Sequence, residues 1–120
     1  MNVPAPLVLL VALGLSGGGL PRDRMEYLVE KLRAMGIDLG YTWVELPSGR
    51  RVSRELVLDI NLLKTLRLVE EVDGILRLTE RGRKAFEKAI RFQSIPKRIV
   101  DAVAKALREL GLGSAESVVS

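Results

Sequence analysis

Residues 68–83 have the sequence LVEEVDGILRLTERGR, in which a tight turn and a helix start follow each other closely. An Asp-Gly pair between β-prone runs indicates a two-residue hairpin, because a type I′ turn needs two positive φ angles. Thr79 is a good N-cap, and the acidic Glu80 after it suits the positive end of a helix dipole. The sequence therefore predicts a hairpin centred on Asp73-Gly74 and a helix from Glu80 to about Phe92.

A helix is expected immediately before this hairpin, from Ser53 to about Leu66. Ser53 is a good N-cap, and at about 100° per residue the apolar side chains fall on one side of the helix. These inward residues are Leu56, Ile60, Leu62, Leu63 and Leu66. The opposite side carries Arg54, Asn61 and Thr65, so we expect these three side chains to face solvent.

Three further helices and a strand are expected around this centre. Apolar residues 6–15 predict a buried first helix that begins near Pro4 or Pro6, and residues 21–35 predict a second helix with the spacing of an amphipathic face. We expect the Gly-rich residues 16–19 between them to form a flexible connection. Residues 40–46 (GYTWVEL) predict a strand whose aromatic side chains pack on the core. Residues 96–110 predict a last helix with a continuous apolar stripe.

The order of these elements, together with the local motifs, resembles a known family. The motif parts are Leu63-x-x-Leu66-x-Leu68-Val69, then Asp73-Gly74, then Leu76-Arg77-Leu78-Thr79-Glu80-Arg81-Gly82-Arg83. Together they resemble the end of the recognition helix, the wing and the following helix of winged helix-turn-helix domains, in particular those of archaeal transcription regulators. A more distant similarity, over residues 41–69, is to the SocA-like (Panacea) antitoxin domains.

The resemblance implies an α+β, mainly helical fold: a winged helix-turn-helix with a short β-hairpin wing and an extra C-terminal helix. Residues 1–92 are then the winged-helix domain. Residues 93–111 are expected to form an amphipathic helix for dimerisation or docking, and residues 112–120 a flexible tail.

The composition narrows the chemistry of this chain. Its 120 residues suit one domain, and the absence of Cys and His removes thiolate nucleophiles, zinc fingers and Ser-His-Asp triads. The carboxylates are spread over amphipathic helices, so we expect no catalytic residue, no cofactor and no metal site. Arg outnumbers Lys 13 to 6, and abundant ion-pairing side chains are typical of thermophiles. Residues 6–15 are too short to span a bilayer and lack signal-peptide features, so we expect no membrane partner and a cytoplasmic location.

The positive charge is concentrated in the middle of the chain. Residues 50–98 carry 13 basic and 7 acidic groups, a net charge of +6, while the segments before and after each carry −1. Such an excess could form a patch for a polyanion.

The family resemblance implies double-stranded DNA as the partner, with the helix after Ser53 in the major groove. It implies DNA contacts for Arg50, Arg51, Arg54, Asn61, Lys64, Thr65 and Arg77. Arg fits guanine O6/N7 and Asn fits adenine N6/N7, while Lys and Thr hold phosphates. Acidic residues weigh against this hypothesis. They are Glu70, Glu71 and Asp73 in the wing, and Glu55 and Asp59 beside the presumed contact face.

A winged helix used as a protein-docking module is the alternative. The last helix then supplies a dimer or partner interface, made of Ile95, Ile99, Val103, Leu107 and Leu110. The partner could be a second copy of the chain, a toxin, or a subunit of a machine that processes nucleic acid, and contact with RNA or the ribosome stays open. The basic residues between 81 and 98 could supply a second basic surface.

Overall fold

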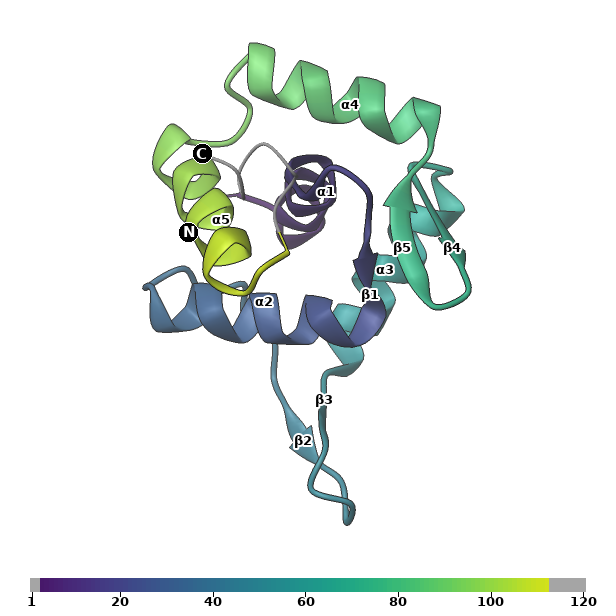
Figure 1. Cartoon of the computed structure of the whole chain (residues 1–120), viewed down its shortest axis with the longest axis vertical. Coiled ribbons are helices and arrows are strands. Elements are labelled where there is room, and N and C mark those ends of the chain that lie inside the picture. The colour runs from purple at the N-terminus through teal and green to yellow at the C-terminus, as the bar shows by residue number, and fades with distance from the viewer. Residues whose placement is uncertain (1–2, 113–120) are drawn as a thin grey trace.

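Helix α1 (Ala5–Ser16) lies at the centre of the molecule, surrounded by the other helices and a small sheet (Figure 1). The computed structural model describes residues 3–112. Its other elements are β1 (Leu20–Pro21), α2 (Arg22–Ala34), β2 (Val44–Glu45), β3 (Arg51–Val52), α3 (Arg54–Thr65), β4 (Val69–Val72), β5 (Ile75–Leu78), α4 (Glu80–Arg91) and α5 (Lys97–Glu109). The expected class, α+β and mainly helical, is confirmed.

α1 is central because it is apolar on every side. Its residues 8–13 (VLLVAL) are all buried, as expected of a helix that has no polar face. It packs against α3, α4, α5 and β5. Among residues 3–112, no helix combines the length and the apolar character needed to cross a membrane. α1 thus serves as the common partner on which α3, α4 and α5 pack.

The predicted hairpin is present. Asp73 and Gly74 both have positive φ angles, 53° and 77°. Val72 lies opposite Ile75 in the antiparallel pairing of β4 with β5, as a two-residue turn requires. The sheet also contains β1, which the sequence did not predict, and its strand order is β1-β5-β4. A strand of two residues is too short for any alternation of polar and apolar side chains to indicate it.

The Gly-rich connection between α1 and β1 is closely packed at Gly19, which corrects the expectation of a flexible link there, whereas Gly17 and Gly18 are exposed. Gly19 has a φ of 112°, and a Cβ at this position would lie 2.6 Å from the carbonyl oxygen of Leu76. Glycine alone tolerates both conditions. The connection therefore allows β1 to approach the edge of β5.

α4 begins after Thr79 as predicted, and the structure gives the Leu-Thr-x-x-Gly motif a physical role. The Thr79 hydroxyl accepts a hydrogen bond from the Gly82 amide at 3.0 Å and donates one to the Arg67 carbonyl at 2.6 Å. A Cβ on Gly82 would overlap the carbonyl oxygen of Leu68. The motif therefore fixes the first turn of α4 against the connection between α3 and β4.

α5 is part of the core, which corrects the expectation that its apolar stripe is a partner interface. Four of the five expected interface residues are buried within the chain: Ile95, Ile99, Val103 and Leu107. The fifth, Leu110, is half-buried against the same core. An apolar stripe shows only that a helix needs a partner. α1 and α2 are that partner here, so residues 93–111 complete the fold of the preceding helices. Of the expected tail, residues 113–120 lie outside the described part of the chain.

The strand expected at residues 40–46 is shorter than predicted, because only β2 pairs, with β3. Together β2, β3 and the turn between them form a hairpin that projects from the body of the molecule, here called the arm (residues 44–52; Figure 1). Before the arm, Tyr41 is buried in the core, as expected of this aromatic side chain. Burial of Tyr41 against the helices takes precedence over the β propensity of the residues around it.

Candidate nucleic-acid interface

The outer face of α3 presents three of the predicted DNA-contacting residues to solvent. Arg54, Asn61 and Thr65 are exposed, and their spacing of seven and four residues places them in one line along the helix. Ser53 caps the helix as predicted, and its hydroxyl accepts a hydrogen bond from the Leu56 amide at 3.3 Å. α3 therefore offers a guanidinium, an amide and a hydroxyl on one exposed line.

The two acidic residues expected beside this line are engaged by the segment before the arm. Thr42 Oγ1 donates to Glu55 Oε2 at 2.6 Å, and the Tyr41 hydroxyl donates to Asp59 Oδ2 at 2.6 Å. The hydrogen bond from Thr42 lowers the pKa of the Glu55 carboxyl. Burial, and next the hydrogen bond to Asp59, raises the pKa of the Tyr41 hydroxyl. Both carboxylates thus hold residues 41–42 on the shoulder of α3.

Aliphatic side chains share the exposed face of α3 with the polar groups. Their exposed fractions are 42% for Val57, 55% for Leu58, 45% for Leu62 and 45% for Leu66. The expectation that Leu62 and Leu66 point inward is wrong, because the buried side of α3 is narrower than its apolar side. A cluster of exposed apolar side chains is typical of a surface that contacts another macromolecule.

The hairpin of β4 and β5 engages neighbouring cations through Glu71. Arg22, at the start of α2, donates from Nε to Glu71 Oε2 at 3.0 Å and from Nη2 to Oε1 at 2.8 Å. Lys64 Nζ lies 3.3 Å from the same Oε1. These hydrogen bonds, chiefly those from Arg22, lower the pKa of the Glu71 carboxyl to about 2. Lys64, a predicted DNA contact, is therefore bound within the protein.

Three other predicted DNA-contacting cations are also paired with carboxylates. The pairs are Arg77 with Glu70 at 3.0 Å, Arg50 with Glu26 at 3.3 Å, and Arg51 with Glu30 at 3.5 Å. The Arg51 guanidinium also lies 5.7 Å from the ring centroid of Trp43. Arg50 and Arg51 belong to the arm and pair with α2, so the structure does not bring them to the outer face of α3. Of the predicted cations, Arg54 alone forms no ion pair among residues 3–112.

The positive charge predicted for the middle of the chain lies outside α3 and the hairpin. Residues 54–78 carry four basic and five acidic groups, a net charge of −1. Residues 79–98 carry seven basic and two acidic groups, a net charge of +5. In the sequence, only the number of basic residues in this second segment indicated a cationic surface, because the family resemblance assigns none of those residues a DNA contact. α4 carries five of these seven basic groups and both acidic groups, a net charge of +3, so it has the largest net positive charge of the helices.

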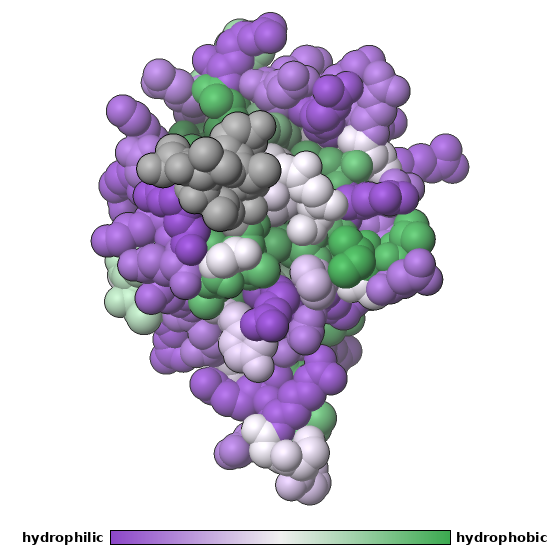
Figure 2. All heavy atoms as spheres, in the orientation of Figure 1, coloured by the Kyte–Doolittle hydropathy of each residue, from purple (hydrophilic) through white to green (hydrophobic). Residues whose placement is uncertain are grey.

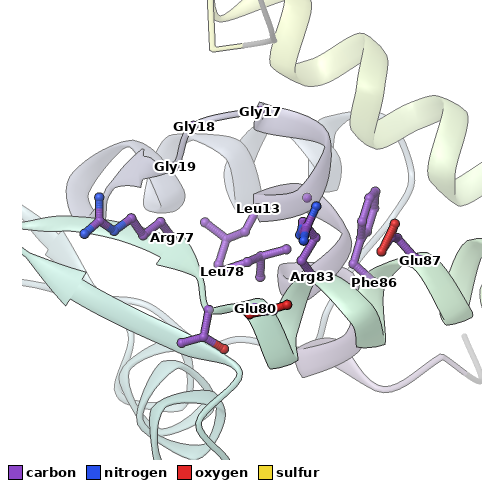
Figure 3. Close-up of a pocket in the computed structure, with 12 residues that line it drawn as sticks. Leu13, Gly17, Gly18, Gly19, Arg77, Leu78, Glu80, Arg83, Phe86 and Glu87 are labelled. Atoms are coloured by element: carbon purple, nitrogen blue, oxygen red, sulfur yellow. The ribbon is translucent and has the colours of Figure 1, made fainter.

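A cleft of about 620 Å³ lies between the Gly-rich connection and α4 (Figure 3). Figure 3 shows Arg83, Phe86 and Glu87 rising from α4 toward the glycines. The Phe86 ring lies against Gly14, where any Cβ would overlap it. Two arginines and two glutamates line the cleft, so it concentrates charge of neither sign. Within residues 3–112 no three acidic side chains lie close enough together to hold a metal ion.

Comparison with family models, with curated proteins and with solved structures finds no match to this chain. Its surface chemistry is therefore the basis on which its function can be inferred.

Proposed function

We propose that this protein is a winged helix-turn-helix DNA-binding regulator whose α3 enters the major groove of a duplex. The succession of α2, α3 and the hairpin of β4 and β5 supports this proposal, because it is the order that the family resemblance implies. One departure is the connection between α2 and α3, residues 35–53, which contains the arm. It is far longer than the roughly 3–4 residues of a simple helix-turn-helix.

The observation that carries the proposal is the exposed line on α3. An α-helix fits the major groove of B-DNA, and residues along its outer face can then reach base edges. Arg54 is suited to guanine and Asn61 to adenine, and neither makes a side-chain hydrogen bond within residues 3–112. Hydrogen bonds from Tyr41 and Thr42 fix the positions of the Asp59 and Glu55 side chains, but they do not remove the charge of a carboxylate, so these two residues still weigh against a phosphate contact here.

The test begins with selection of a preferred duplex from a random pool by the wild-type chain. We then expect Arg54→Ala combined with Asn61→Ala to weaken binding to that duplex by roughly 30-fold or more relative to a scrambled one, since each of the two base contacts is worth about 1–3 kcal/mol. Arg108→Ala, on the exposed side of α5, is the control that removes the same charge. Failure to select any sequence, or an unchanged preference in the double variant, would overturn the proposal.

A second candidate function is protein docking through the same helix, and the exposed aliphatic residues of α3 favour it. Four half-exposed aliphatic side chains are more than base recognition needs. For this candidate we take a second copy of the chain as the occupant, so a homodimer would form through α3 and not through α5. Leu58→Gln combined with Leu62→Gln is expected to convert such a dimer to a monomer in light scattering. A monomeric wild-type chain at high concentration would eliminate this candidate.

A further inference from the structure

Four basic side chains form a regular row on α4, here called the α4 stripe. They are Arg81, Lys84, Lys88 and Arg91, and all four are exposed. Spacings of three, four and three residues keep them on one side of the helix, opposite the buried Gly82 and Ala89. Ten steps of about 1.5 Å make the stripe roughly 15 Å long. Figure 2 shows mostly hydrophilic side chains along the upper edge of the molecule, where α4 lies.

Most of the basic side chains of the α4 stripe form no ion pair within residues 3–112. Among residues 3–112, Lys84 alone of the four forms an ion pair, with Glu80 at 4.0 Å, and both side chains are largely exposed. An exposed pair at that distance contributes little and is easily exchanged for another anion. The acidic groups on α4 are Glu80 and Glu87. The stripe therefore keeps a clear excess of available positive charge.

The stripe also borders a depression beside the end of α3. This hollow, of about 580 Å³, is lined by Arg81, Lys84, Lys88, Glu80, Ala85 and Leu68. Leu68 follows α3 directly, and Gly82 holds α4 against it. A concave surface with three cations and one carboxylate focuses a positive potential more than a flat one does.

We propose that the α4 stripe binds the sugar-phosphate backbone of nucleic acid. A row of separated cations matches a chain of evenly spaced phosphates, and DNA carries one negative charge per about 1.7 Å of its axis. The inference goes beyond the proposed function, because it needs backbone contacts only and no base contact from α3. It also accounts for how a chain whose α3 and hairpin have a net charge of −1 can hold a polyanion.

The experiment measures binding of a labelled duplex of arbitrary sequence at several salt concentrations. The test variant combines Arg81→Ala, Lys84→Ala and Lys88→Ala. Each phosphate contact contributes a slope of about −0.9 to the dependence of log K on log salt, so the slope is expected to shrink by about 2.7. Binding at about 0.1 M salt is expected to fall by roughly 10- to 100-fold.

The matched control combines Arg33→Ala, Lys105→Ala and Arg108→Ala, which remove the same charge from exposed positions on α2 and α5. Circular dichroism verifies that both variants are folded. The proposal is overturned if the two triple variants lose affinity equally, because net charge alone then explains binding. It is also overturned if the wild-type chain binds phosphatidylserine vesicles but no duplex.

The same assay separates this inference from the proposed function. If α3 recognises bases, Arg54→Ala with Asn61→Ala removes sequence preference and leaves binding to the arbitrary duplex nearly intact. Loss of binding in the stripe variant, together with unchanged preference in the α3 variant, would support the stripe and reject the proposed role of α3. If the stripe variant binds as tightly as the wild type and the α3 variant loses its sequence preference, the proposal for the stripe is rejected and the proposed role of α3 is retained.

Discussion

α3 and α4 both carry basic residues, but the two helices differ in what those residues contact. On the α3 side, Lys64 is bound to Glu71 at 3.3 Å, and Arg77 of the hairpin is bound to Glu70 at 3.0 Å. On α4, Arg81 and Lys88 form no ion pair within residues 3–112. A basic side chain that is already paired with a carboxylate must break that ion pair before it can bind a phosphate. We therefore expect the pairing of the basic residues, and not only their number, to decide which of them bind a polyanion.

The difference arises from the elements that surround each helix. The hairpin after α3 carries Glu70 and Glu71 on adjacent positions, within reach of cations from three elements. α4 packs with the small residues Gly82 and Ala89 inward, and among residues 3–112 its cationic side chains form no ion pair with another element. Its position relative to α3 depends on the contact between Gly82 and Leu68.

The largest effect is expected from Gly82→Ala, which tests whether that contact fixes α4. The new Cβ would overlap the Leu68 carbonyl, so the first turn of α4 must shift, and we expect a loss of about 3 kcal/mol in the free energy of unfolding. Gly18→Ala is the matched control, because a Cβ there meets nothing within 4 Å. Urea titrations of both variants give the comparison. Equal stability of the two would show that α4 is not held by this contact.

An intermediate effect is expected from Glu71→Gln, which removes the carboxylate shared by Arg22 and Lys64. We expect a loss of about 2 kcal/mol in the free energy of unfolding, since two charge-assisted contacts are weakened. Glu70→Gln, which affects an exposed pair with Arg77, is expected to cost less than about 1 kcal/mol. In Glu71→Gln, Lys64 is no longer held by an ion pair and can contact a phosphate. The affinity of this variant for an arbitrary duplex is therefore expected to rise by roughly fivefold at most, because one close charge contact in water is worth about 1 kcal/mol.

The same carboxylate gives a pH dependence with a definite sign. The pKa of Glu71 is about 2 in the folded chain, against an ordinary value of 4.5. Its contribution to stability is therefore complete above about pH 4.5 and is lost as the pH falls from there through about 2. The stability difference between the wild type and Glu71→Gln is expected to shrink over this interval. A difference that is constant from pH 6 to pH 2.5 would contradict the assigned hydrogen bonds.

The smallest effect is expected from Arg50→Ala combined with Arg51→Ala in the arm. Their ion pairs with Glu26 and Glu30 are exposed, so we expect a loss of at most about 1 kcal/mol in the free energy of unfolding. Because both cations pair with α2, affinity for a duplex should fall far less than it does in the stripe variant. A loss as large as that of the stripe variant would place the arm in the interface and remove the contrast between α3 and α4.

Local signals predicted most of the secondary structure. The turn at Asp73-Gly74 and the N-caps Ser53 and Thr79 depend on neighbours within three residues, so they are visible in the sequence. The errors came from contacts between distant residues. β1 forms only because β5 is beside it, and the side chains on the α5 stripe are buried because α1 and α2 cover them. A stripe of apolar residues cannot indicate whether its partner lies in the same chain.

The sequence by itself determined the five helices, the type I′ turn and the exposed line of Arg54, Asn61 and Thr65, because periodicity and capping act within one element. The tertiary structure alone decided which cations remain available. Arg22 reaches Glu71 across 49 positions of the chain, and no local pattern encodes that contact. Pairing depends on distances between elements, and only the folded chain sets those distances.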